Sequence, residues 1–504
     1  MPVNSDLPTN LRTVREAFGA SPDLVIRNFT ITLNTGAMKK PLPAAVVWID
    51  GLIDTALVDQ HVLRPLMFEA GQTHSREYIK HGDILQFIRE RVVTLGNLET
   101  ANDLNMVIQG FLQGKVGLFV GSYPEAILGD VKEWEARKPE EPPSEITIRG
   151  PREGFVEDLR TNITLLRRKL RNPNLRIETM TLGSQTRTSV AIVYLEKIAN
   201  PAVVEEVRAR LGRIKIEAIL ADQYIEELIR DAPLSPFPTV VNSERPDATA
   251  AGLSEGQIAI IVDGSPFALR VPAGFLQFFQ ASEDYFVSFQ TATFSRLLRF
   301  VAFASSLLLP SLYVAVTTFN PEMIPSTLLV TITAAREGIP FPTVIEVLIM
   351  ELTFEFLREA GLRMPRALGQ AVSIVGALVL GQAAIQAGIV SAPTVVIVAG
   401  TAIASLMFAR PDIIAMSRIV RFLFLFLAAT LGLFGIMAGF ILLHIHIVSL
   451  RSFGVPYLSP LAPINLAELR DVLMRRPYWE KINRPKSLTR QASPGQMRNG
   501  GRRK

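Results

Sequence analysis

The sequence predicts an α+β N-terminal region in two subdomains, cytoplasmic in location, followed by an all-α polytopic membrane domain. Residues 300–321 and 370–409 contain no charged side chain, and the ionisable side chains of residues 422–450 are two histidines. A helix of about 20 apolar residues crosses about 30 Å of hydrocarbon, so each of these stretches is long enough to span a bilayer. The residues before 296 carry charge throughout and are interrupted by turn signals, which is typical of a soluble mixed fold.

Composition excludes several classes of function. The 504 residues include no cysteine, which excludes disulfides, thiol nucleophiles, cysteine metal sites and a lipid-modified cysteine. The first ten residues are polar and lack the apolar run of a secretory signal. We therefore expect the first hydrophobic helix to act as the insertion signal, with the preceding region in the cytoplasm.

Five segments are expected along the chain. They are an N-terminal α/β subdomain (1–137), a proline-rich linker (138–145), a second α/β subdomain (146–295), the helical transmembrane domain (296–452) and a basic C-terminal tail (453–504). The tail is either a solvated disordered segment or a basic segment that contacts anionic lipid. Its arginines and lysines place it on the cytoplasmic side in both cases. No aromatic platform accompanies the charge, so nucleic acid is not an expected partner.

Periodicity predicts the elements of the two subdomains. The first is expected to have a buried strand over 44–49, helices over 54–70, 74–93 and 99–110, and a hairpin of strands 116–121 and 126–131. The second is expected to have helices over 157–171 and 222–230 and from Pro201, strands over 176–182 and 188–195, and a hairpin over 258–271. The aromatic-rich residues 275–286 are expected at the membrane surface.

The soluble part offers little chemistry. Residues 110–115 are one residue short of a phosphate-binding loop, and Val116 stands where a magnesium-binding hydroxyl is required. His61, His74 and His81 show no metal-ligand spacing, and no catalytic arrangement of side chains is visible. We therefore expect neither enzymatic activity nor a cofactor.

Several motifs carry a family resemblance. They are AAVVWIDGLID (44–54), the basic helix region 150–175, Glu244 to Asp247 (ERPD), GQIAIIVDGSPFAL (256–269), FLQFFQASEDYF (275–286), AAREGIPFP ending at Pro342, and FGVPYLSPLAP (453–463). In this set the chain resembles the A subunits of GerA-type spore germinant receptors, from about residue 11 to residue 477. Residues 18–23 (FGASPD) look closer to receptor subunits than to an accessory homologue of the same architecture.

The resemblance implies a location and partners. It implies a multi-pass protein of the spore inner membrane with a cytoplasmic N-terminal region. It implies a transporter-like B subunit that holds the nutrient germinant, and a lipoprotein C subunit. It also implies that the A subunit forms a homo-oligomeric ring that conducts ions when the germinant binds.

Acidic side chains interrupt one of the apolar segments. Residues 343–361 contain Glu346, Glu351 and Glu355, and on a helix Glu351 and Glu355 fall on one stripe with Arg358 and Glu359. A carboxylate facing lipid at the helix centre costs at least about 2.5–3.5 kcal/mol. In a ring of subunits, Glu346, Glu351 and Glu355 would line a cation path. The alternative is an amphipathic helix that lies at the membrane interface with its acidic side chains in water.

Small and polar residues mark helix contacts in the remaining spans. Gly381 belongs to a small-residue stripe of residues 370–390, and Gly435 and Gly439 form a GxxxG pair. Gln382 and Gln386 are expected to hydrogen-bond between helices, with a pore-lining role as the alternative. Residues 422–450 are long for one span and short for two, so the sequence predicts four to five spans. A re-entrant piece over 323–335 is also expected.

The function expected from these observations is a non-enzymatic membrane subunit that senses nutrients through a partner and gates cations. The alternatives are a secondary transporter of small solutes and a non-conducting scaffold or accessory subunit of the germination complex. A large soluble region, few spans and no visible inverted repeat argue against the transporter.

Overall fold

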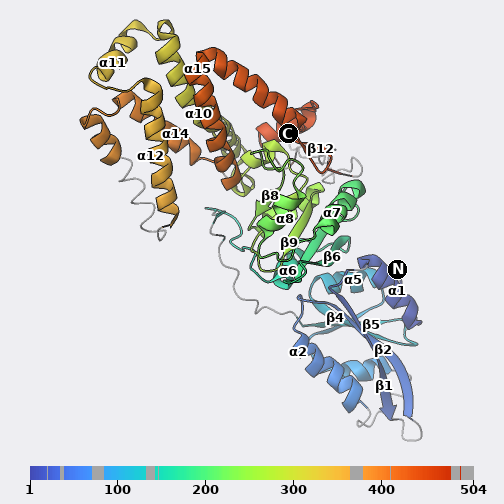
Figure 1. Ribbon diagram of the computed structural model, residues 1–504. Coiled ribbons are helices and arrows are strands. Elements are labelled where there is room, and N and C mark those ends of the chain that lie inside the picture. Colours follow the sequence, from blue (N-terminus) through green and yellow to red (C-terminus); the bar gives the residue numbers. More distant parts are fainter. Residues whose placement is uncertain are drawn as a thin grey trace, which may run out of the picture. The chain divides into compact units, whose positions relative to one another are not determined.

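The computed structural model describes residues 1–19, 21–34, 39–70, 84–131, 142, 144–145, 147–363, 379–408, 410–477, 479 and 488–489 (Figure 1). These residues form two compact units. The α/β unit comprises Met1–Arg230, Val240–Pro272 and Ile482–Lys504, and the helical unit comprises Asp231–Thr239 and Ala273–Lys481. The prediction of two α/β subdomains followed by a helical region is confirmed.

The first subdomain is an antiparallel five-stranded sheet with helices on both faces. The strand order is β1-β2-β4-β5-β3, formed by β1 (Leu24–Asn34), β2 (Lys39–Ile49), β3 (Leu98–Ala101), β4 (Lys115–Val120) and β5 (Ala126–Asp130). Successive side chains of β2 alternate between two cores, as expected of a strand buried on both faces. Val46 and Trp48 face one core, and Val47 and Ile49 face the other.

Helical segments fill both of these cores. One face is covered by α2 (Thr55–Val58), η1 (Asp59–Leu63), η2 (Pro65–Glu69), α4 (Ile84–Phe87) and η3 (Ile88–Val92), and the other by α1 (Leu7–Phe18) and α5 (Leu104–Leu112). The helix expected over 99–110 is wrong at its start, because residues 98–101 pair with β5 as an edge strand. Asp103 then caps α5 by accepting a hydrogen bond from Asn105 N. Of the helix expected over 74–93, residues 74–83 lie outside the described residues, as do His74 and His81.

The second subdomain has a sheet with the order β6-β7-β9-β10-β8. Its strands are β6 (Leu175–Leu182), β7 (Thr188–Leu195), β8 (Val241–Ser243), β9 (Ile258–Val262) and β10 (Ala268–Val271), and its helices are α6 (Leu159–Lys169), α7 (Pro201–Arg213), α8 (Asp222–Ile229) and α9 (Pro246–Glu255). The expected helices and hairpin are present. The short β8 and the weakly amphipathic α9 were not predicted.

A buried ion pair joins the two subdomains. Arg167 of α6 donates to both carboxylate oxygens of Asp23, at 2.7 and 3.1 Å, and to Ser21 Oγ at 3.0 Å. The side chain of Arg167 is 1% exposed. The basic helix of the second subdomain is therefore fixed to the loop that follows α1.

The linker between the subdomains lies mainly outside the described residues. Its end is held by Ser243 and by the ERPD motif that follows it, since Ser243 Oγ donates to the Glu145 carboxylate and Arg245 Nη1 donates to the Glu145 carbonyl. Arg245 also donates to Pro151 O and is fully buried. One family motif therefore serves to anchor the connecting segment.

Among the described residues of the helical unit, two helices are long and apolar enough to cross a membrane, α10 (Phe289–Phe319) and α15 (Pro411–Ser449). The other elements are η4 (Phe275–Phe279), η5 (Ser282–Tyr285), η6 (Pro321–Met323), α11 (Ser326–Arg336), α12 (Thr343–Arg363), helical residues 379–386, α14 (Ala392–Ser405), β11 (Arg451–Ser452), β12 (Val455–Pro456) and α16 (Leu466–Leu473). The expected re-entrant piece corresponds to α11, in which no residue is buried. The number of membrane crossings stays a prediction.

Helix α15 is bent sharply at Gly432 (Figure 1). Gly432 has φ 61° and ψ −140°, a conformation that only glycine adopts readily. As a result, the arm after the bend lies close to the arm before it, so that a Cβ on Gly435 or on Gly439 would meet Leu427. A segment that is too long for one span is thus divided into two helical arms.

The aromatic segment 275–286 lies inside the helical unit. Phe278 and Phe279 are at most 2% exposed, and the Phe279 ring stacks on Phe300 of α10 at 4.6 Å. These rings are core side chains of the helical unit, and the location of the segment at the membrane surface stays a prediction.

Candidate functional site

Two carboxylates of α12 face two arginines of α15. Arg421 Nη1 donates to Glu351 Oε2 at 2.6 Å, with side-chain exposures of 2% and 0%. One turn further along α12, Glu355 forms an ion pair with Arg418. Residues three or four apart lie on one face of a helix, so the spacings of the two pairs match. Two ion pairs therefore join α12 to α15.

Glu346 is directed to a different neighbour. It is fully buried, and its Oε2 accepts hydrogen bonds from Ser391 N at 2.9 Å, Ser391 Oγ at 2.7 Å and Thr394 Oγ1 at 3.1 Å. Its other oxygen accepts from Arg336 Nε at 3.2 Å. Because Ser391 precedes α14, the carboxylate sits at the N-terminus of that helix, where negative charge is favoured.

All three glutamates predicted from the sequence therefore have basic or hydrogen-bonding partners within the described chain. A buried carboxylate without a partner is unfavourable, and pairing with a guanidinium offsets much of that cost. Glu359, the remaining glutamate of the acidic stripe, is exposed instead and forms a surface ion pair with Arg363. Whether Glu346, Glu351 and Glu355 line an ion path stays a prediction.

The arginine partners were missed by sequence reasoning. From sequence, Arg410, Arg418 and Arg421 are expected to bracket a polar loop between spans, but α15 begins at Pro411 and includes Arg418 and Arg421. A signal was present, because Ile413, Met416, Val420 and Phe424 continue a helical apolar periodicity through the arginines, and all four are buried.

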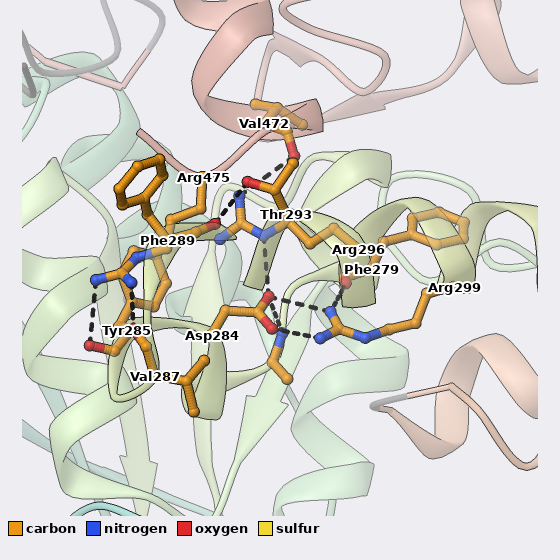
Figure 2. Close-up of polar contacts among 11 residues, drawn as sticks. Phe279, Asp284, Tyr285, Val287, Phe289, Thr293, Arg296, Arg299, Val472 and Arg475 are labelled. Carbon is orange, nitrogen blue, oxygen red and sulfur yellow. Dashed lines mark hydrogen bonds and ion pairs between the residues drawn. The ribbon is translucent and has the colours of Figure 1, made fainter. Parts of the chain in front are cut away.

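A second charged cluster lies at the start of α10 (Figure 2). Asp284 accepts from Arg296 Nε at 2.9 Å and from Arg299 Nη1 at 3.0 Å. Arg299 also donates to Phe279 O. The sequence places Arg296 and Arg299 just before the first span, as expected of a cytoplasmic N-terminal side. The structure instead has both of them buried, in a helix that begins earlier, at Phe289.

The segment after α15 completes this cluster. Arg296 Nη1 donates to Val472 O at 3.3 Å, and Arg475 Nη1 donates to Val287 O at 2.5 Å. The guanidinium groups of Arg296 and Arg475 both lie over the Tyr285 ring, at 5.5 and 5.8 Å from its centroid. Figure 2 shows the two arginines approaching the ring from different segments. The beginning of α10 is thus tied to residues that lie far along the chain.

Of the residues predicted for helix contact, the glycines lie close to neighbouring atoms, whereas the glutamines are exposed. A Cβ on Gly381 would lie 3.2 Å from Val395 of α14, and one on Gly435 would lie 2.2 Å from the Leu427 carbonyl oxygen. At Gly439 the nearest atom would be a methyl carbon of Leu427, at 2.7 Å. Gln382 and Gln386 are both exposed in the described chain.

The two histidines of α15 also have separate partners. His446 Nε2 lies 2.8 Å from Ser235 Oγ, and His444 Nδ1 lies 2.8 Å from the Phe440 carbonyl of its own helix. Among the described residues, no three histidine, aspartate or glutamate side chains are grouped as metal ligands.

Comparison with known proteins gives consistent matches over nearly the whole chain. Residues 12–487 match the family described as Bacillus/Clostridium GerA spore germination protein. The chain is 43% identical over 491 residues to Spore germination protein KA of Bacillus subtilis (strain 168), covering 97% of this chain and 88% of that protein. It is 38% identical over 490 residues to the uncharacterized membrane protein YfkQ of the same organism, covering 97% and 92%.

One solved structure is also similar. It is the N-terminal domain of the A subunit of the Bacillus megaterium spore germinant receptor GerK3, with 33% sequence identity and a TM-score of 0.40. The match covers 55% of this chain and 99% of that one.

Proposed function

Because the chain belongs to the Bacillus/Clostridium GerA spore germination protein family, we propose that it is the membrane subunit of a spore germinant receptor and triggers germination in response to nutrients. In this proposal the chain is not an enzyme. It oligomerises into a ligand-gated cation channel, whose ion path carries the carboxylates of Glu346, Glu351 and Glu355.

The ion pairs between α12 and α15 are the observation that supports a gated path. Glu351 and Glu355 are the groups that would attract cations, and Arg421 and Arg418 neutralise them in the closed form. Opening then requires that α12 and α15 separate enough to expose the carboxylates to water. Rings of acidic side chains favour cations in channels, so the exposed carboxylates would make the open path cation-selective.

The chemistry of the pairs also explains why the closed form would not leak. A guanidinium paired with a carboxylate leaves no net charge to hold an ion, and the low dielectric of the surroundings strengthens their attraction. A conformational change must supply the free energy that breaks both pairs. We propose that germinant binding to a partner subunit supplies it.

The partners and the location follow from the same proposal. The partners are a transporter-like B subunit that holds the germinant and a lipoprotein C subunit, together with further copies of this chain. The protein is a multi-pass protein of the spore inner membrane with its N-terminal region in the cytoplasm. Two apolar helices of spanning length and the similarity to a membrane protein support this location.

Two other functions remain as alternatives. A secondary transporter would move a labelled solute with fixed stoichiometry, and a scaffold or accessory subunit would support germination without conducting. The ion pairs favour the channel over the scaffold, because ionisable side chains within apolar helices are rare and commonly mark ion paths.

The test compares spores that lack this chain with spores that carry the Glu351→Gln/Glu355→Gln double variant at normal protein level. In a nutrient broth, we expect the deletion to prevent the response that depends on this receptor. We expect the double variant to change the rate of potassium release. The matched control is Glu359→Gln, because Glu359 lies on the same helix in an exposed pair. Normal potassium release from the double variant would overturn the proposed ion path.

A further inference from the structure

Ser452, in β11 just after α15, hydrogen-bonds to two backbone segments that lie far apart in the sequence. It is fully buried, its Oγ donates to Thr239 O at 2.7 Å, and the same oxygen accepts from Ala273 N at 2.9 Å. Thr239 and Ala273 mark two of the four positions at which the chain passes between the two units, one before β8 and one after β10. A single hydroxyl therefore bridges both passages.

The two passages lead to neighbouring strands. β8 begins at Val241, two residues after Thr239, and β10 ends at Val271, two residues before Ala273. These strands pair antiparallel at the edge of the second sheet, with Arg270 opposite Val241. Two residues of extended chain span at most about 7 Å, so only a short stretch of backbone separates each partner of Ser452 from its strand.

A second set of contacts fixes the nine-residue segment Asp231–Thr239 to the same end of α15. Asp231 accepts from Phe453 N at 2.8 Å, and Ser235 Oγ lies 2.8 Å from His446 Nε2. Phe237 is 1% exposed and its ring lies 5.7 Å from the His446 ring. By contrast, Leu234 of the same segment is fully exposed. The segment between α8 and β8 is thus packed as part of the helical unit.

We propose that Ser452 and the Asp231–Thr239 segment form a coupling junction, through which movement of the C-terminal arm of α15 reaches β8 and β10. The covalent chain carries the displacement from Thr239 and Ala273 into the sheet edge, and Ser452 makes both passages move together. Its use in germination rests on the proposed receptor function, whereas the coupling itself is a property of the chain. The junction would let the soluble region report on, or act on, the bend at Gly432.

The test measures hydrogen exchange of the full chain in lipid nanodiscs. Gly439→Leu perturbs the C-terminal arm of α15, because a side chain there meets Leu427 and Phe424. Should that variant fail to fold, Leu427→Ala perturbs the same contact from the other side. In the otherwise native chain, we expect the perturbation to speed exchange in residues 433–449 and to speed exchange of the β8 and β10 amides by about threefold or more.

The junction is then opened by Ser452→Ala, or by Phe237→Ala if the first variant is unstable. We expect the β8 and β10 response to be lost while the response of residues 433–449 remains, and Ser452→Thr to restore it because the hydroxyl is kept. Ser449→Ala is the matched control, since that hydroxyl donates to the His446 carbonyl of its own helix. An unchanged strand response in Ser452→Ala, or no strand response in the native junction, would overturn the proposal. Because no germination is measured, either result leaves the test of the receptor function separate.

Discussion

Arg421 of α15 and Glu351 of α12 form an ion pair 2.6 Å long in which neither side chain is more than 2% exposed. The two residues are 70 positions apart, and their pairing joins the helix that carries the acidic residues to the helix that bends at Gly432. Separating this pair inside the apolar unit would leave two isolated charges, which is strongly unfavourable. The pair is therefore the centre of the proposed gate.

Removing one partner of this pair should destabilise the helical unit more than removing both. Glu351→Gln leaves the buried Arg421 guanidinium without its carboxylate, and Arg421→Gln leaves the buried Glu351 carboxylate without its guanidinium. We expect each variant to lose about 3–5 kcal/mol of unfolding free energy. The double variant Glu351→Gln/Arg421→Gln should recover a large part of that cost. Denaturant titration of the single and double variants in detergent measures the interaction free energy between Glu351 and Arg421. Additive losses in the double variant would show that the pair has no net interaction.

Gly432→Ala should destabilise the bend in α15. The backbone at φ 61° and ψ −140° costs a residue with a side chain about 1–3 kcal/mol, and the added Cβ would lie 2.9 Å from Phe319 Cγ. We expect a lower midpoint of thermal unfolding. Gly400→Ala in α14 is the control, because its Cβ would meet no atom closer than 3.9 Å and alanine is favoured in a helix. Equal midpoints for the two variants would count against a required bend.

Arg167→Met should weaken the contact between the two α/β subdomains. Its buried pair with Asp23 loses both hydrogen bonds and leaves the carboxylate without its guanidinium, at a cost of about 3–5 kcal/mol. The adjacent Arg168→Met removes a partly exposed pair with Glu153, which contributes under about 1 kcal/mol. Urea unfolding of the full chain, followed by tryptophan fluorescence, compares the two. The account is contradicted if Arg168→Met is the more damaging substitution.

The second subdomain should lose stability in acid through Glu178. A hydrogen bond from Arg208, at 2.6 Å from Nη2, lowers the pKa of Glu178 below its ordinary 4.5. The Tyr194 hydroxyl also donates to this carboxylate, and burial together with that bond raises the pKa of Tyr194 to about 12. A lowered folded-state pKa means that the stabilisation is complete above pH 4.5 and is lost as the pH falls through the folded-state value.

Glu178→Gln tests this dependence. We expect wild-type protein to be more stable than the variant at pH 6, by under about 1 kcal/mol because the pair is partly exposed. The difference should shrink as the pH is lowered from 4.5. A difference in unfolding free energy that stays constant from pH 6 to pH 3 would disprove the assignment.

Local patterns predicted most of the α/β unit. The apolar, β-branched run 44–49 and the turn residues between β4 and β5 predict strands directly from sequence. The miss at residues 98–101 has a clear cause, since this edge strand is only four residues long and is defined by its pairing with β5. The weakly amphipathic α9 gave no usable periodicity, because its exposed face is short and its other face packs on a sheet that assembles from distant segments.

The candidate site was only half predictable. The burial cost of a carboxylate identified Glu346, Glu351 and Glu355, but nothing local in the sequence shows that Ser391, Arg336 or Arg421 lies beside them. Those partners come from other helices, and helix packing decides which residues meet. The same holds for Asp284, because the position of Arg296 and Arg299 just before the first span does not show which carboxylate they meet.

The most direct test of the central claim is the conductance of the purified receptor assembly, reconstituted in a planar lipid bilayer with a potassium chloride gradient. We expect the nutrient-triggered assembly to pass cations in preference to chloride, and Glu351→Gln/Glu355→Gln to reduce this selectivity while Glu359→Gln does not. A triggered assembly that passes no current, or one whose selectivity is unchanged in the double variant, would contradict the account.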